Sequence, residues 1–360
     1  FGSSHMGLNA SMENGGPDPP GGGRAAGSQR ADNRRPTTWS ATDWRREFDE
    51  ERCRPYGPSG EYLRSMRRKV QETTLQALNH GLYVDENGDE VALPYEEMRK
   101  GLRDVQVYDH DRYPFQEPAP LSEEKVHEPF GGTSVEVWEM DCLEAAQKLL
   151  EDDPHGHVAV LNMANESCPG GGWQRGAGAQ EENLHRRTNL VDHLSNYRRL
   201  PNTKRVRYPL PEFGGVFSQK VCVFRGSELR GYPFLAKPQF VSVITAAAYC
   251  RPQCNDGKLA GRFNKGTEKK ITSMLRVLRY YGVELVVLSA FGCGAFSNPP
   301  HHIAELFCEQ LSAQEFRGQF KRVVFAIIED HNSIRGDGGG NVAPFQRVFC
   351  PRAAAAAAGS

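Results

Sequence analysis

Residues 158–190 read VAVLNMANESCPGGGWQRGAGAQEENLHRRTNL, and this stretch decides the fold. It opens with an apolar run that is typical of a buried parallel strand. The chain then enters a loop that holds Gly170, Gly171 and Gly172, and a helix is predicted from Gln180 onwards. Glycine lets the backbone approach an anion closely, and a helix N-terminus offers unpaired N–H groups. The stretch therefore predicts a phosphate-binding loop between a strand and a helix.

Two adjacent glutamates, Glu181 and Glu182, stand at the start of the predicted helix. One interpretation is that they are partners of the helix dipole, which favours negative charge at this end. The other is that they do chemistry, because carboxylates beside a phosphate loop repel the ligand unless they act on it.

The stretch also resembles the signature of the microbial-type poly(ADP-ribose) glycohydrolases, whose fold is a macrodomain. The resemblance rests on the triple glycine, the seven-residue spacer from Trp173 to Ala179, the sequence Gln-Glu-Glu, and a strand that ends in Ala164-Asn165. It extends over most of residues 59–350. The N-terminal extension is longer and more basic than a minimal bacterial form would need, so we expect a eukaryotic member, with fungi as the first source to consider.

Length and composition limit the class of protein. The chain has 360 residues, 25% of them charged, and a formal net charge of −1, which suits one large or two smaller soluble units. Near-neutral charge gives no global attraction to a polyanion, so such a ligand must be held by a local site. We therefore predict no direct binding to nucleic acid. The chain has no apolar run near the ~20 residues that a membrane span needs, so we expect no membrane association.

The nine cysteines are scattered and odd in number. With no visible secretion signal, this indicates reduced thiols in the cytoplasm or the nucleus. Cys250 and Cys254 are the close pair worth testing for zinc, but no second cysteine pair has zinc spacing. We expect packing or surface thiols.

We divide the chain into four parts. Residues 1–38 are predicted to be a disordered tail that begins with FGSSHM, a sequence typical of cloning leaders. Residues 39–132 form an accessory region with a helix over 59–80, a hairpin about Asn87-Gly88, and a Pro-rich surface segment over 103–130. Residues 133–350 form the catalytic core, and residues 351–360 are a low-complexity tail.

Strands and helices alternate after residue 133, which predicts an α/β protein with a mixed, mostly parallel sheet. The predicted helix of the motif runs to about residue 200. A second glycine loop, FGCGAF at residues 291–296, follows the apolar strand at 284–290. Ligands bind at the carboxyl ends of strands in open α/β sheets, and two such loops would suit a diphosphate. The resemblance adds a macrodomain-like three-layer α/β/α arrangement.

The resemblance also implies the chemistry. Glu182 matches the catalytic acid and base that cleaves the ribose–ribose bond of poly(ADP-ribose), Glu181 the residue that holds the adjoining ribose hydroxyls, and Asn165 a contact to the distal ribose. The expected substrate-binding residues are Asn165, Gly170, Gly171, Gly172, Gln180, Gly292, Cys293, Gly294, Ala295 and Phe296, although Phe296 can equally be a core aromatic. No metal and no cofactor is expected.

The resemblance gives poly(ADP-ribose) and ADP-ribosylated proteins as partners of a monomeric hydrolase. Two alternatives stay open: an ADP-ribose reader with the same fold, and a hydrolase of mono-ADP-ribosylated proteins. The sequence also leaves open whether cleavage starts from chain ends or inside the polymer.

Overall fold

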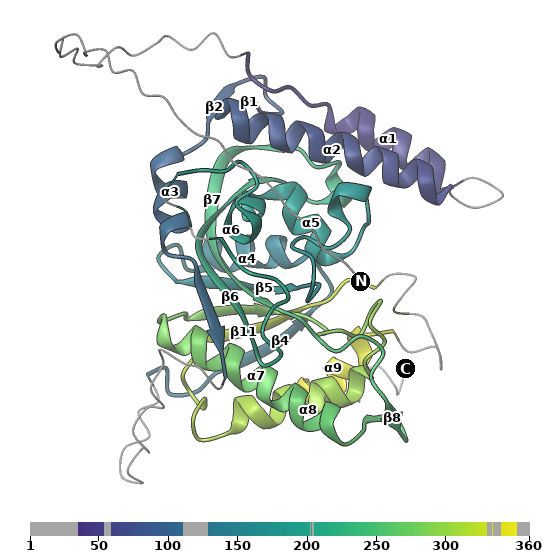
Figure 1. Ribbon diagram of the computed structural model, residues 1–360, viewed down its shortest axis with the longest axis vertical. Helices are drawn as coiled ribbons and strands as arrows, with labels where there is room; N and C mark the ends of the chain where they lie inside the picture. Colours follow the sequence, from purple (N-terminus) through teal and green to yellow (C-terminus); the bar gives the residue numbers. More distant parts are fainter. Residues whose placement is uncertain are drawn as a thin grey trace, which may run out of the picture. The chain divides into compact units, whose positions relative to one another are not determined.

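The computed structural model describes residues 35–53, 59–110, 129–201, 203, 205–329, 333 and 340–350. Within them, seven strands form the central sheet in the order β3-β6-β7-β5-β10-β11-β4 (Figure 1). Their bounds are β3 Gln106–Asp109, β4 Ser134–Trp138, β5 Val158–Met163, β6 Gly214–Arg225, β7 Phe234–Ala246, β10 Leu285–Leu288 and β11 Arg322–Ala326. The strand pairs from β7 to β4 are parallel, whereas β3–β6 and β6–β7 are antiparallel. The predicted mixed, mostly parallel sheet is confirmed.

Helices cover both faces of this sheet (Figure 1). One face carries α4 (Cys142–Asp152), α5 (Gln180–Arg187) and α6 (Leu190–Ser195), and the other carries α7 (Arg262–Tyr280), α8 (Pro300–Ser312) and α9 (Val342–Phe349). Each face has its own apolar core. Leu184 and Leu194 belong to the first core, and Met274 and Phe307 belong to the second. The three-layer α/β/α arrangement follows from this division.

The N-terminal region packs against the first helix layer. It comprises α1 (Ala41–Arg52), α2 (Gly60–His80), a hairpin of β1 (Leu82–Val84) and β2 (Glu90–Ala92), and α3 (Tyr95–Arg103). The predicted helix and hairpin are confirmed, and Gly81 ends α2 with a left-handed φ of 71°. Helix α2 lies over α5 and over η1, the short 3-10 helix Trp173–Arg175 (Figure 1).

Two details of the predicted accessory region are wrong. Residues 106–109 were expected to run over the surface, but they form β3 and pair with β6 in the main sheet. Tyr108 is buried there at 2% exposure, because its ring fills the core that covers the edge of the sheet. Residues 35–38 were assigned to a free tail, yet Thr37 is buried and exchanges backbone hydrogen bonds with Leu82 and Val84. The rest of the predicted tails lies outside the described residues.

The helix predicted from residue 182 to about residue 200 is also interrupted. Helix α5 ends at Arg187, and α6 begins at Leu190. Thr188 forms an isolated bridge with Val223, and the Asn189 side chain accepts a hydrogen bond from the backbone N–H of Cys222. The two residues thus pair with the neighbouring strand β6, which competes with continuation of the helix.

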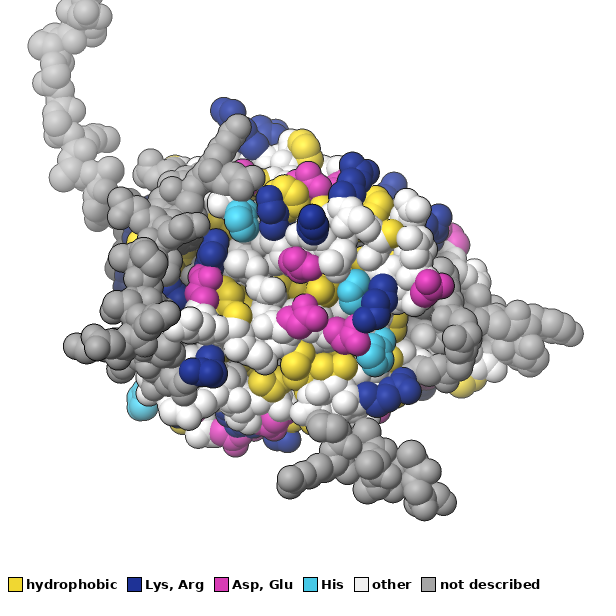
Figure 2. Space-filling model, turned by 90° about the horizontal axis from the view of Figure 1, so that it is seen from below, with side chains coloured by type: hydrophobic (Ala, Val, Ile, Leu, Met, Phe, Trp, Pro, Cys, Tyr) yellow, Lys and Arg dark blue, Asp and Glu magenta, His cyan; other side chains and the backbone are white. Residues whose placement is uncertain are grey.

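Charged side chains of both signs are interspersed over the face of the molecule in Figure 2, in keeping with a net charge near zero. Across the described ranges, no helix has both the length and the apolar character that crossing a membrane requires.

Candidate active site

Both glycine loops lie at one edge of the sheet. Strands β5 and β10 are neighbouring parallel strands, with Val158 opposite Leu285, so their carboxyl ends meet at the same edge. By the roles that the sequence predicts for them, we call residues 164–179, which follow β5, the catalytic loop, and residues 291–298, which follow β10, the diphosphate loop. The diphosphate loop also lies close to the end of β7. A Cβ added to Gly292 would lie 2.5 Å from the Cβ of Ala248, which follows this strand. The predicted juxtaposition of the two loops is therefore present.

Glu181 holds the catalytic loop. Its Oε2 accepts a hydrogen bond from the backbone N–H of Asn165 over 2.7 Å, and its Oε1 accepts one from Gly170 over 3.0 Å. The side chain is buried at 3% exposure. Burial raises the pKa of Glu181 to about 8, and the neighbouring Glu182 acts in the same direction, while the two backbone N–H groups oppose the shift. Contact with ribose hydroxyls must use the remaining lone pairs of these oxygens.

Glu182 has one oxygen fixed and one unpaired. Its Oε1 accepts a hydrogen bond from the backbone N–H of Gly172 over 2.8 Å. Its Oε2 is buried and has no hydrogen-bond partner among the described residues. An unpaired buried polar atom costs free energy, and a folded protein that keeps one usually uses it. The carboxyl group is thus oriented by one oxygen and presents the other for chemistry.

The middle glycine of the loop is required by the carboxylates. Gly171 has a φ of +54°, and a Cβ there would lie 2.6 Å from Oε1 of Glu182 and 3.1 Å from Oε2 of Glu181. A side chain would therefore collide with both catalytic carboxyl groups and strain the backbone. The glycines and the two glutamates of the motif therefore pack directly against one another.

The loop glycines differ from expectation in one respect. The three N–H groups of Gly170, Gly171 and Gly172 already donate to Glu181, to the carbonyl oxygen of Cys168 and to Glu182. The catalytic loop is closed around the two carboxyl groups, which take the place that a phosphate was expected to occupy. The hydrogen-bonding capacity of these N–H groups is therefore already used inside the protein.

Gln180 and Asn165 also use their amides locally. The Gln180 side chain accepts a hydrogen bond from the backbone N–H of Met163 over 2.9 Å and donates to the carbonyl of Leu161. It therefore ties the start of α5 to the end of β5, in place of the substrate contact we expected. The amide oxygen of Asn165 accepts from Ser167 and Cys168, so its amide nitrogen is the atom that can donate to a ribose hydroxyl.

The diphosphate loop is built differently. The backbone N–H groups of this loop at Gly294, Ala295 and Phe296 donate no hydrogen bond within the part of the chain that the structure describes. Successive free N–H groups form an anion-binding concavity. A Cβ added to Gly294 would meet nothing within 4 Å. This loop has the open donors that the catalytic loop lacks.

Two side chains of the diphosphate loop face the protein. Cys293 is buried, its backbone N–H donates to Ala290, and burial raises the pKa of its thiol. Phe296 is half-buried and packs against the core below the loop, and its contact to a ligand stays a prediction. Asn298 braces the loop by donating to the carbonyl oxygens of Tyr249 and Gly292.

The N-terminal helix α2 supports the catalytic loop, which no sequence signal indicated. Arg67 on α2 makes two hydrogen bonds to Glu228, at 2.8 and 2.9 Å. Its guanidinium carbon would lie 2.5 Å from a Cβ on Gly178 in the loop spacer, and a Cβ on Gly176 would lie 2.1 Å from the carbonyl oxygen of Arg64. The two spacer glycines therefore let α2 press directly on the catalytic loop.

Two further residues beside the carboxyl groups were missed. Trp173, to which we assigned no role, is buried under the loop and packs on His185 at 5.5 Å. The Tyr208 hydroxyl is buried and has no hydrogen-bond partner in the described part of the chain. Burial and the nearby Glu181 raise the pKa of Tyr208. A single aromatic residue in an irregular segment gives no sequence signal for such a position.

The described residues include no group of three His, Cys, Asp or Glu side chains placed to hold a metal ion. Cys250 and Cys254 are exposed free thiols.

Comparisons with known proteins show what the chain is similar to. Residues 71–226 match the family model described as "Microbial-type PARG, catalytic domain". A poly(ADP-ribose) glycohydrolase from Thermomonospora curvata, bound to the inhibitor ADP-HPD, shares 28% identity, covers 79% of this chain and 100% of its own, and superposes with a TM-score of 0.61. No curated protein sequence matches the chain.

A second solved structure supports the fold alone. The poly(ADP-ribose) glycohydrolase from Deinococcus radiodurans in complex with ADP-ribose shares 24% identity, covers 73% of this chain and 100% of its own, and has a TM-score of 0.54. These relatives are bacterial, so the eukaryotic source stays a prediction.

Fold and site together define an α/β protein of the macrodomain type, with two neighbouring carboxyl groups at the edge of its sheet. Over residues 71–226 the chain is similar to the microbial-type PARG catalytic domain, and over most of its length it is similar to the solved structure from Thermomonospora curvata.

Proposed function

We propose that the protein hydrolyses the ribose–ribose O-glycosidic bond of poly(ADP-ribose) and releases ADP-ribose. The observation that carries this proposal is the Glu182 carboxyl group, with one oxygen held by the Gly172 N–H and the other buried and unpaired. Such a group can give a proton and retrieve one without losing its orientation.

The reaction runs in two proton transfers. Glu182 donates its proton from Oε2 to the glycosidic oxygen, so that the bond to the anomeric carbon breaks and the neighbouring ribose leaves as an alcohol. An oxocarbenium-like centre remains on the distal ribose. Glu182, now a carboxylate, takes a proton from water, whose oxygen bonds to the anomeric carbon. The enzyme returns to its starting state, and one water molecule is consumed for each ADP-ribose released.

Other residues of the edge bind and orient the substrate. The diphosphate loop supplies the N–H groups of Gly294, Ala295 and Phe296 to the diphosphate. The amide nitrogen of Asn165 and the free lone pairs of Glu181 orient the distal ribose. The negative charge of the diphosphate lies near the developing cation and stabilises it.

A reader module is the alternative from a different class. It would bind ADP-ribose at the same edge but would need neither an oriented carboxyl group nor its unpaired oxygen. A hydrolase of mono-ADP-ribosylated proteins would share the distal site, so we keep it as a second activity. We further propose that ADP-ribosylated proteins carry the substrate, and that the protein acts as a monomer in the cytoplasm or the nucleus.

Incubation with poly(ADP-ribose), followed by chromatography and mass spectrometry of the products, tests the proposal. We expect free ADP-ribose to accumulate, and EDTA to leave the rate unchanged. Folded protein that binds ADP-ribose but releases none from the polymer would identify a reader. A mono-ADP-ribosylated protein in a parallel reaction measures the second activity.

A further inference from the structure

Residues 196–210, which we call the arginine loop, carry a concentrated positive charge. The segment reads NYRRLPNTKRVRYPL, with five basic residues and no acidic one, in a chain whose net charge is −1. Arg198 anchors the loop, since it pairs with the fully buried Asp192 and donates to the carbonyl oxygen of Leu78. The described arginines that follow in this segment, Arg199, Arg205 and Arg207, therefore extend from a loop whose base is fixed.

The other described arginines of this loop point to solvent. Arg199, Arg205 and Arg207 are exposed, and none of them has an ion pair recorded within the described residues. Tyr197 is exposed at 46% beside them. Unpaired arginines next to an exposed aromatic ring are the combination that binds a flexible polyanion with stacked bases.

The arginine loop runs alongside the catalytic loop and touches it near both ends. The Tyr197 ring meets Trp173 edge-on, with ring centroids 6.2 Å apart. The backbone N–H of Leu210 donates to the carbonyl oxygen of Glu166 over 2.7 Å. Between these contacts, Tyr208 lies close enough to Glu181 for the carboxylate to influence its pKa. A polymer bound along this loop would lead directly to the carboxyl groups.

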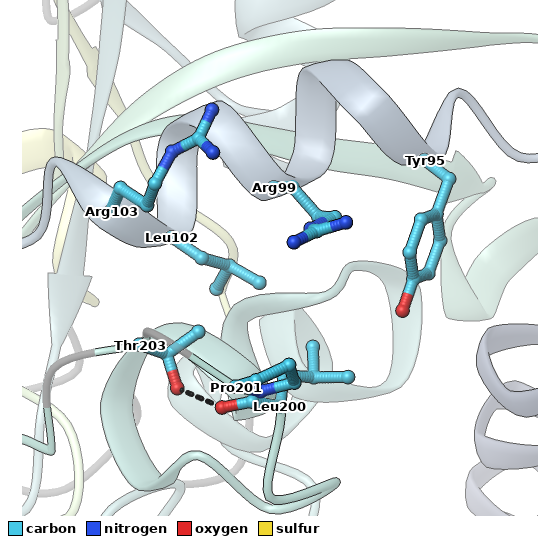
Figure 3. Close-up of a pocket in the computed structure, with 7 residues that line it drawn as sticks. All are labelled: Tyr95, Arg99, Leu102, Arg103, Leu200, Pro201 and Thr203. Carbon is cyan, nitrogen blue, oxygen red and sulfur yellow. Dashed lines mark hydrogen bonds between the residues drawn. The ribbon is translucent and has the colours of Figure 1, made fainter. Parts of the chain in front are cut away.

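Helix α3 extends the same surface. A cavity of about 70 Å³ lies between α3 and the residues Leu200, Pro201 and Thr203. Figure 3 shows Tyr95 and Arg99 on α3 facing Leu200 and Pro201 across it. Tyr95 is exposed at 40%, and Arg103, at the end of α3, is also exposed. A second tyrosine and two more arginines thus continue the pattern away from the catalytic loop.

We propose that this surface, formed by the arginine loop and α3, binds the ADP-ribose units of the polymer that lie beyond the scissile bond. This inference rests on the proposed function. Each unit offers a diphosphate for the arginines and an adenine that can stack on Tyr197 or Tyr95. The contacts to the catalytic loop favour this polymer over nucleic acid, because its terminal unit is then placed at Glu182.

The test compares a short and a long ligand on the full chain. In a Glu182→Gln background, which prevents turnover, we would measure the affinities of ADP-ribose and of a purified polymer of about twenty units. For Arg199→Glu/Arg205→Glu/Arg207→Glu, we expect polymer affinity to fall at least ~10-fold at low salt, with a shallower salt dependence. ADP-ribose affinity should stay within about twofold of the parent.

Lys237→Glu provides the matched control. Lys237 is exposed on β7, near the start of this strand, whereas the site lies at the other end, beyond Ala246. The substitution therefore reverses one charge away from the site. It should leave polymer affinity unchanged, whereas Arg207→Glu alone should lower it. This single variant also keeps the test informative if the triple variant unfolds.

Three outcomes would overturn the inference: unchanged polymer affinity in the arginine variants, an equal loss of ADP-ribose affinity, or equally tight binding of a single-stranded RNA of matched charge. The first leaves the proposed function intact. That function fails separately, if wild-type protein releases no ADP-ribose from the polymer.

Discussion

The two glycine loops look alike in sequence but are built for different tasks. In the catalytic loop, the N–H groups of Gly170, Gly171 and Gly172 are all used inside the protein. In the diphosphate loop, three successive N–H groups have no hydrogen-bond partner among the described residues, and a Cβ on Gly294 would meet none of their atoms within 4 Å. Glycine serves the first loop by letting two carboxyl groups come close, and the second by leaving room for a ligand.

This difference teaches that a glycine loop after a strand does not by itself identify a phosphate site. The decisive feature is which acceptor the N–H groups of the loop bind. A buried carboxyl group can accept their hydrogen bonds as well as a phosphate can. Substitutions in the catalytic loop should therefore alter chemistry, and substitutions in the diphosphate loop should alter binding.

The largest effect is expected from Glu182→Gln. The amide keeps the size of the side chain but cannot give and retrieve a proton, so turnover should fall by ~10²–10⁴. Initial rates of ADP-ribose release, measured at saturating polymer, test this. A fall of less than about threefold would place the acid elsewhere.

Gly171→Ala should come next. The added Cβ would lie 2.6 Å from Oε1 of Glu182 on a backbone with a φ of +54°, so the carboxyl group must move. A displacement of this kind costs roughly 10² in rate. Steady-state kinetics should show the loss in kcat, and thermal unfolding should show a lower melting temperature. Normal kcat would mean that the loop tolerates rearrangement.

Gly294→Ala provides the opposite result in the other loop. Its Cβ meets no protein atom within 4 Å, so the melting temperature should stay the same. A methyl group in the place of the diphosphate should weaken ADP-ribose binding by about tenfold, a loss of about 1.4 kcal/mol. Calorimetry tests the affinity for ADP-ribose, and kinetics at saturating polymer test turnover separately. Lost stability with normal binding would contradict this assignment.

Stability should depend on pH through Glu181. Its pKa is raised from 4.5 to about 8, so between these values the folded state holds a proton that the unfolded state has lost. The contribution of this proton to the free energy of unfolding is complete below pH 4.5 and is lost as pH rises through 8. The free energy of unfolding changes by at most about 1.4 kcal/mol per pH unit.

Urea unfolding between pH 6.5 and 8 tests this best, because the lowered pKa values of His185 and His193 act only at lower pH. Wild-type stability should fall across this window more steeply than that of Glu181→Gln. Parallel curves would show that Glu181 is already ionised in the folded protein.

The smallest effect is expected from deletion of residues 1–34. Deletion of residues 1–38 should cost more, because it removes Thr37 and its hydrogen bonds to Leu82 and Val84. Melting temperatures of the two truncated proteins give the comparison. Equal values would mean that Thr37 contributes nothing.

The sequence predicted much of this account. Apolar runs such as residues 158–161 and 285–288 predicted the strands of the parallel part, because burial on both faces requires continuous hydrophobic residues. The glutamate pair and both glycine loops were found from their sequence motifs and from the resemblance to the glycohydrolase family. Strand β3 was missed, since Gln106 and Asp109 give it little apolar pattern.

The details of the site needed the structure. Hydrogen bonds between a side chain and a distant backbone N–H, such as those of Glu181, leave no periodic signal. The support from Arg67 depends on residues 161 positions apart. Glycines in the spacer could have suggested a close approach, but not that α2 makes it.

The most direct test of the central claim is calorimetric titration of ADP-ribose into the Glu182→Gln protein, alongside its rate of polymer cleavage. If Glu182 does chemistry while the diphosphate loop binds, affinity should equal or exceed that of wild type, because a negative charge near the diphosphate is removed, while cleavage is almost abolished. Loss of ADP-ribose binding together with cleavage would contradict the division of labour between the two loops.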